Sequence, residues 1–205
     1  MKPAAILDIG SSKVVCLCGS SVHTDGILVH GVGICEYSGF EGGEFPDEAS
    51  LGEAILTAIE TAEQQSRIRI REVALSVPAP FVKLITTQAT LLIESRSRRI
   101  TVDDIDDVIS MSLEKARAPG HILMHSTPVL FKIGGVESAQ VPEGARADEL
   151  SATVSHMYVQ ESFVRLLERM LSSMNVEISM CVSAQLAEAI HIICLLYTSD
   201  AADEL

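Results

Sequence analysis

The sequence has few aromatic residues and few positive charges. Only 4% of its 205 residues are aromatic, and none is Trp, so surfaces that stack bases or sugar rings are scarce. The chain contains 15 Lys and Arg and 28 Asp and Glu, which gives a formal net charge of −13. A long nucleic-acid footprint needs a basic face, so we expect no nucleic-acid partner. A single nucleotide needs only a local positive pocket and stays possible.

Long apolar runs and metal-binding patterns are also missing. No stretch reaches the roughly 18 apolar residues of a membrane span, and no basic and then apolar leader opens the chain. The five cysteines lie in apolar runs, which indicates buried, reduced thiols of a cytoplasmic protein. Cys16 and Cys18 have no second pair at zinc-ligand spacing, and His121 and His125 have no acidic or thiol partner.

What is present is an alternation of strands and helices around 47% hydrophobic residues, enough to bury a core. The first 80 residues predict a three-stranded antiparallel meander, then a helix and a strand. The middle predicts a strand, a helix and further strands, and the last part predicts a helix, a strand and a helix. The predicted ranges are 4–9, 13–19, 27–36, about 48–66, 72–78, 83–94, about 102–117, 121–135, 149–159, 160–174, 176–182 and 183–193.

The change of pattern after Pro80 and its return near Tyr158 predict one α/β subdomain with an insertion. Residues 1–80 and 158–193 would be the two parts of the subdomain, and 81–157 an α+β module. The last stretch, CLLYTSDAADEL (194–205), does not continue the amphipathic helix before it. It resembles the translated read-through of a sequencing adapter. We assign it no function; a short polar tail is the alternative.

The stretch LDIGSSK (7–13) is the strongest candidate site. A turn of small residues after a buried strand exposes successive backbone amides, and such a concavity binds phosphate oxygens. Asp8, at the strand end, can hold magnesium directly or through water, and Lys13 can add positive charge. The alternative is a plain hairpin, with Asp8 bonded to the turn amides and Lys13 in solvent.

Two other glycine-rich segments, GVG (31–33) and GFEGG (39–43), are weaker phosphate-binding candidates. Glycine-rich loops are common, and no complete dinucleotide-binding or Walker A pattern occurs. The local sequence therefore leaves the choice between a nucleotide site and a structural hairpin open.

The order of elements decides more than any single motif. A D-I-G-S-x hairpin, a strand with G-x-G, a Gly-rich loop, a helix and a strand together are similar to the start of actin-like ATPases. Residues 31–78 (GVGICEYSGFEGG to ALSVP) resemble the FtsA family of bacterial cell-division proteins. Residues 98–116 (RRITVDDIDDVISMSLEKA) and 121–133 (HILMHSTPVLFKI) resemble that family's inserted SHS2 module. The resemblance covers about residues 1–193.

The resemblance implies an actin-like (ribonuclease H-like) α/β subdomain interrupted by an α+β module of the SHS2 type. It implies a cytoplasmic protein that binds ATP and magnesium and polymerises at the inner membrane of the division site. Such a protein tethers the FtsZ ring to that membrane and recruits later division proteins. By resemblance Asp8 holds magnesium through water, the amides of Gly10, Ser11 and Ser12 hold the β- and γ-phosphates, and Lys13 adds charge. No catalytic residue is implied, and the whole protein would be a weak ATPase at most.

The chain also departs from the family pattern. The second phosphate loop, the adenosine loop, the FtsZ-contacting subdomain and the C-terminal amphipathic membrane helix are expected beyond Ile193. The family's Asn-Pro-x-Gly is only partly kept, as Val141-Pro142-Glu143-Gly144. With one phosphate loop, each of whose amide bonds contributes roughly 1 kcal/mol, we expect this chain alone to bind ATP weakly or not at all.

Two other functions stay open. An actin-related sugar or acid kinase would need a catalytic base beside an acceptor pocket, and no candidate stands out in 1–193. A stand-alone interaction module would use the insertion, where Arg96, Arg98 and Arg99 form a basic patch in an acidic chain. That patch is either a protein contact or a solvated turn.

Overall fold

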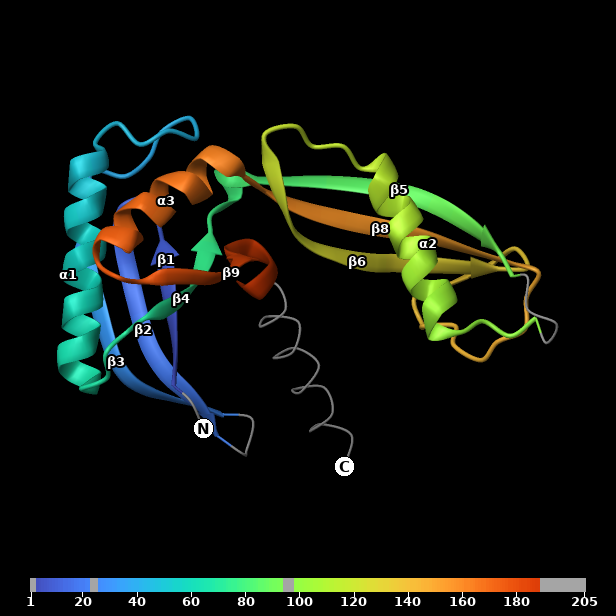
Figure 1. Ribbon diagram of the computed structural model, residues 1–205, viewed down its shortest axis with the longest axis horizontal. Helices are drawn as coiled ribbons and strands as arrows, with labels where there is room; N and C mark the ends of the chain where they lie inside the picture. Colours follow the sequence, from blue (N-terminus) through green and yellow to red (C-terminus); the bar gives the residue numbers. More distant parts are fainter. Residues whose placement is uncertain (1–2, 23–25, 94–97, 189–205) are drawn as a thin grey trace, which may run out of the picture. The chain divides into compact units, whose positions relative to one another are not determined.

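The computed structural model describes residues 3–22, 26–93 and 98–188 (Figure 1). The chain divides into two compact units: Met1–Val82 with Ser162–Leu205, and Lys83–Glu161. The sequence pattern predicts these boundaries near Pro80 and Tyr158. The predicted tail at 194–205 lies outside the described residues.

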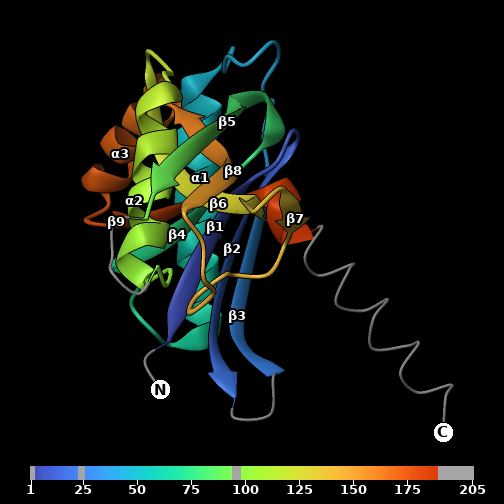
Figure 2. The ribbon, with the colours of Figure 1, turned by 90° about the vertical axis from the view of Figure 1, so that its right-hand side faces the viewer.

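The first unit is built on a five-stranded sheet of order β3-β2-β1-β4-β9 (Figures 1 and 2). β1, β2 and β3 form the predicted antiparallel meander, whereas β4 and β9 run parallel to β1. Its elements are β1 (Ala4–Ile9), β2 (Lys13–Val22), β3 (Gly26–Glu36), α1 (Glu48–Ser66), β4 (Glu72–Val77), η1 (Ala79–Phe81), α3 (Glu161–Ser173) and β9 (Glu177–Ser183). Of the helix predicted over 183–193, the described part is helical at 184–188.

Helix α1 approaches β3 more closely than a side chain would allow. A Cβ atom on Gly33 would lie 1.8 Å from the carbonyl oxygen of Ala58, and one on Gly31 would lie 2.4 Å from that of Ala62. Small residues on the buried face of the helix also permit this approach. The buried residues are Leu51, Ala54, Ile55, Ala58, Ile59 and Ala62. The GVG segment is therefore a helix–sheet contact.

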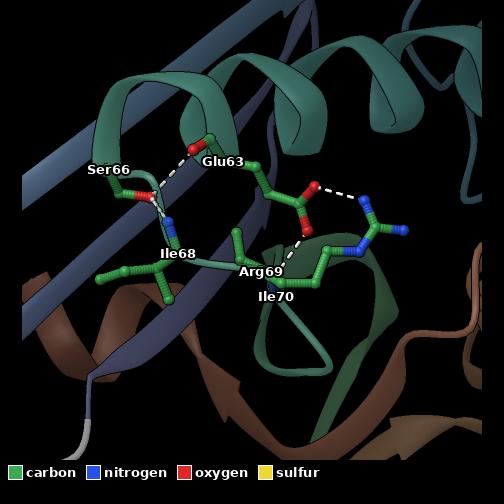
Figure 3. A network of polar contacts seen from close by, with 5 residues as sticks. All are labelled: Glu63, Ser66, Ile68, Arg69 and Ile70. Carbon is green, nitrogen blue, oxygen red and sulfur yellow. Dashed lines mark hydrogen bonds and ion pairs between the residues drawn. The ribbon is translucent and has the colours of Figure 1, made fainter.

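Both ends of α1 are closed by polar side chains. Asp47 accepts a hydrogen bond from the amide of Ser50 at 2.9 Å, as expected for an N-cap. At the other end Glu63 accepts from the Ile70 amide and from the Arg69 guanidinium, both at 2.7 Å (Figure 3). Glu63 thus ties the last turn of the helix to the segment that leads into β4.

Helix α3 lies beside α1, with Arg169 and Glu48 3.9 Å apart. Its Phe163 belongs to an aromatic cluster that also contains Tyr37, Phe40, Phe45 and Phe81. The rings of Phe81 and Phe163 are stacked with centroids 4.3 Å apart, and both residues are buried. This cluster fixes the loop between β3 and α1 to the core of the first unit.

The second unit is a four-stranded sheet of order β5-β8-β6-β7 with one helix on it. Its elements are β5 (Val82–Leu92), α2 (Val102–Lys115), β6 (His121–Ile133), β7 (Val136–Ser138) and β8 (Glu149–Gln160). Helix α2 begins with a complete capping box, in which the side chains of Thr101 and Asp104 accept hydrogen bonds from each other's backbone amides. It ends at Lys115, two residues earlier than expected.

A polar network lies between α2 and its sheet. His156 of β8 is fully buried, and its Nε2 lies 3.1 Å from the hydroxyls of both Thr87 and Ser112. Its Nδ1 lies 2.8 Å from the hydroxyl of Ser126. Burial lowers the pKa of His156, so the ring is neutral at neutral pH.

The basic patch of the insertion is locally paired where it is described. Arg98 forms an ion pair with Asp148, and the Arg99 guanidinium donates to the carbonyl of Gly144 at 3.1 Å. These contacts join the segment before α2 to the loop that carries Gly144. Arg96 lies outside the described residues.

Candidate functional site

Asp8 lies on the central strand of the first sheet, near its carboxyl end. Its neighbours in the ladder are Val15 on β2 and Ser76 on β4. Leu7 and Ile9 are fully buried, so alternation along the strand directs Asp8 to the opposite face. That face is open among the described residues: Ile6 is 45% exposed. In α/β sheets ligands bind at the carboxyl ends of parallel strands, and Asp8 lies at that end.

The turn after Asp8 leaves two amides available. The Gly10 amide donates to the Lys13 carbonyl at 2.9 Å. It is therefore not available for phosphate, which the resemblance had implied. Within the residues that the structure describes, the amides of Ser11 and Ser12 donate to no other group. Both residues and Lys13 are exposed. A Cβ on Gly10 would lie 3.0 Å from the Lys13 carbonyl oxygen, so glycine keeps this turn tight.

The arrangement fits a phosphate group better than a bare metal ion. Two free amides and an ammonium group can meet phosphate oxygens, and one carboxylate suits a magnesium ion that keeps waters and phosphate ligands. Across 3–22, 26–93 and 98–188, no three His, Cys, Asp or Glu side chains are placed to hold a metal. The groups that can contact phosphate are thus the Ser11 and Ser12 amides and the Lys13 ammonium group, while the Asp8 carboxylate can hold magnesium and Gly10 permits close approach.

Sequence reasoning missed two residues of the loop after β3. Tyr37 and Gly39 contact the turn, although they are more than twenty residues away in sequence. The Tyr37 hydroxyl donates to the Gly10 carbonyl at 2.7 Å, and its amide donates to the Ser12 carbonyl at 3.1 Å. The glycine-rich composition of 39–43 marks a loop in the sequence, but it does not indicate which residues the loop contacts.

The two cysteines of β2 lie in the core of the first unit. Cys16 and Cys18 are buried, and all four described cysteines are free. Burial and the neighbouring Cys18 and Glu63 raise the pKa of Cys16 to about 12, so it is not a thiolate at neutral pH. Cys194 lies outside the described residues.

A cleft of about 550 Å³ opens at the amino ends of the parallel strands, away from Asp8. Arg69, Arg71 and Asn175 are among its lining residues, and Arg69 is paired with Glu63. No helix among the described residues is long and apolar enough to cross a bilayer.

No protein-family model matches the chain. Several curated proteins are similar to it in sequence. The cell division protein FtsA of Enterococcus faecalis is 27% identical over 138 residues, which cover 67% of this chain and 31% of that protein. FtsA of Streptococcus pneumoniae is 28% identical over 138 residues, and FtsA of Pseudomonas aeruginosa is 26% identical over 184 residues. The last match covers 89% of this chain and 43% of that protein. The chain therefore spans less than half of the length of these relatives.

A solved structure extends the comparison to the fold. A chain of the PilM–PilN type IV pilus biogenesis complex superposes with a TM-score of 0.58 at 15% identity, over 90% of this chain and 48% of that chain. The expected fold class, an α/β actin-like fold, is confirmed. In sequence the chain is FtsA-like over most of its length.

Proposed function

We propose that a full-length protein carrying this sequence is an FtsA-like cell-division protein that binds ATP. It would polymerise on the cytoplasmic face of the inner membrane, tether the FtsZ ring there and recruit later division proteins. One observation carries the proposal: the similarity to FtsA runs over 184 residues and thus through both units. A kinase reading lacks this support, because the matched relatives are named as division proteins.

The turn after β1 is the part of the ATP site that this chain contributes. Bound ATP with magnesium would supply the negative charge that the turn is shaped to receive. The exposed Ser11 and Ser12 amides hold phosphate oxygens, and Lys13 compensates their charge. Asp8, half-buried beside Ser76, orients the waters around magnesium. One turn offers few hydrogen bonds, each worth about 1 kcal/mol, so the isolated chain binds ATP weakly.

The first test measures ATP binding by the full-length protein. Asp8→Asn keeps the shape of the side chain and removes its charge, so we expect magnesium-dependent affinity for ATP to fall about tenfold. Asp106→Asn, an exposed acid on α2, is the matched control and leaves affinity unchanged. Equal magnesium-dependent affinity of wild type and Asp8→Asn would exclude Asp8 from the site.

A second test addresses the partners. Purified full-length protein, FtsZ filaments and vesicles with anionic lipids are sedimented together with ATP. We expect FtsZ to sediment with the vesicles only when the protein is present. Recovery of FtsZ in the supernatant under all conditions would contradict the tethering role.

A further inference from the structure

The loop between β3 and α1 contacts three successive carbonyl groups of the turn. The Gly10 oxygen accepts from the Tyr37 hydroxyl at 2.7 Å, and the Ser12 oxygen accepts from the Tyr37 amide at 3.1 Å. Between them, the Ser11 oxygen lies against Gly39, where a Cβ atom would come within 2.2 Å. We call Tyr37 and Gly39 the brace.

Holding a carbonyl also orients the amide of the next residue. The peptide group is planar and trans, so its C=O and N–H point in opposite directions. The Gly10 carbonyl faces Tyr37, which turns the Ser11 N–H away from the brace. The Ser11 carbonyl faces Gly39, which turns the Ser12 N–H away likewise. These are the two turn amides that donate to no other group among the described residues.

From this geometry we infer that Tyr37 and Gly39 are positioning residues, which hold the Ser11 and Ser12 amides in the orientation that receives phosphate. The inference rests on the proposed function for the ligand, but the geometry of the brace is independent of it. If the carbonyls were released, either peptide group could rotate and withdraw its N–H from the site.

The brace is itself held in place. The Tyr37 ring lies 6.4 Å from that of Phe45, which stacks on Phe81 at 5.4 Å. Burial raises the pKa of Tyr37 to about 12, so its hydroxyl keeps the proton it donates. Gly39 has a φ of +82°, and its contact with the Ser11 oxygen leaves no room for a side chain. The cluster thus connects the turn to the core of the first unit.

The two contacts can be broken separately. Tyr37→Phe removes the hydroxyl and keeps the ring in the aromatic cluster, so it releases the Gly10 carbonyl and should loosen the Ser11 amide. Gly39→Ala places a methyl group against the Ser11 oxygen and should disturb the Ser12 amide. Gly43→Ala is the matched control, because Gly43 has the same φ of +82° but its Cβ would come no closer than 3.9 Å to another group, the Pro80 oxygen.

The first measurement needs no ligand: ¹⁵N relaxation of the 205-residue chain. We expect order parameters of about 0.85 at Ser11 and Ser12 in the wild type and in Gly43→Ala. They should fall below about 0.6 at Ser11 in Tyr37→Phe and at Ser12 in Gly39→Ala. Unchanged values in both variants would overturn the inference, whatever ATP does. Thermal unfolding of each variant shows that loss of order is not loss of the fold.

The second measurement is magnesium-ATP affinity of the full-length protein. We expect the dissociation constant to rise about fivefold in Tyr37→Phe and about tenfold or more in Gly39→Ala, with less than a twofold change in Gly43→Ala. Loosened amides with unchanged ATP affinity would overturn the positioning role. A wild-type protein that binds no ATP would contradict the proposed function, while the relaxation result would still decide whether the brace exists.

Discussion

In the first unit α1 meets its sheet through backbone contacts at glycine, whereas in the second unit α2 meets its sheet through a buried imidazole and hydroxyls. Gly31 and Gly33 bring strand and helix backbones together. In the insertion, His156 joins Thr87 and Ser112 across the same kind of interface. Both units pack a helix on a sheet, but the first does so through close backbone contact and the second through buried hydrogen bonds.

The difference teaches what each unit is sensitive to. A contact made by close backbone approach depends on shape and has no titrating group, so it responds to added volume and not to pH. A buried hydrogen-bond network tolerates no unpaired member and responds to protonation of its histidine. Substitutions at the two interfaces, and acid, should therefore affect the stability of the two units differently.

The largest effect is expected from Gly33→Ala. Its Cβ would lie 1.8 Å from the backbone oxygen of Ala58, so α1 has to move off the sheet. We expect the first unit to lose about 3 kcal/mol or more of its free energy of unfolding, measured by hydrogen exchange of α1 peptides. Gly52→Ala, which meets nothing within 4 Å on α1, should stabilise the helix slightly. Equal effects of the two substitutions would contradict the close approach.

The next effect is expected from His156→Leu in the insertion. The ring would be replaced by a side chain that cannot bond Ser126 or Ser112, and buried hydroxyls would lose partners. We expect a loss of about 2–3 kcal/mol, confined to the second unit. Hydrogen exchange of α2 peptides measures it. If exchange in the first unit rises equally, the comparison fails.

The same histidine predicts that acid destabilises the α2 interface of the second unit and not the α1 interface of the first unit. Burial lowers the pKa of His156 in the folded state, so below about pH 6.5 the unfolded chain binds a proton that the folded chain does not. The contribution of His156 to stability is therefore complete above that pH and is lost as the pH falls. We expect the protection factor of α2 amides, in which the pH dependence of the intrinsic exchange rate is removed, to fall with acid, and His156→Leu to flatten this dependence. His125→Gln, at an exposed position, is the control and keeps the slope.

A smaller effect is expected where α1 ends. Glu63→Ala removes the acceptor for the Ile70 amide and the partner of Arg69, and we expect a loss of about 1–2 kcal/mol. Arg69→Ala should cost less than about 0.5 kcal/mol, because that side chain is 60% exposed. Denaturation by urea measures both. A larger effect of Arg69 than of Glu63 would mean that the ion pair, and not the backbone bond, closes the helix.

A further small effect is expected at the helix N-caps, where both units use the same kind of hydrogen bond. Asp47→Ala and Thr101→Ala each remove a side chain that accepts from a backbone amide three residues on. We expect about 1 kcal/mol for each, in its own unit, measured by the change in exchange of the first turn of each helix. If only one of the two substitutions lowered stability, the two units would differ at their helix ends as well as at their helix–sheet interfaces.

Local features could be predicted from the sequence because their causes are local. The meander follows from strand-length apolar runs, and the Thr101 cap follows from a hydroxyl three residues before an acid. The boundaries of α1 and β4 differ from the predictions by one residue at most. The turn at Asp8 was found for the same reason, since strand, carboxylate and small residues are consecutive.

Contacts between distant residues could not be read in this way. Glycine at position 33 suits a phosphate loop and a helix contact equally, so only the approach of Ala58 distinguishes them. His156 sits at a regular inward position of its strand, and nothing in the sequence names Thr87 and Ser112 as its partners. The brace was hidden likewise, because Tyr37 and Gly10 are brought together only by the pairing of three strands.

The parallel pairing of β4 with β9 has a consequence for the order of events in synthesis. The Ser179 hydroxyl donates to the Val73 carbonyl across 106 residues of sequence, and the whole insertion lies between the two strands. During synthesis, the edge of β4 that pairs with β9 therefore stays unpaired until the insertion and β9 have left the ribosome. Contacts within the insertion are closer in sequence and can form first. We expect the inserted module to be protected from protease on nascent chains before the sheet that carries Asp8 is complete.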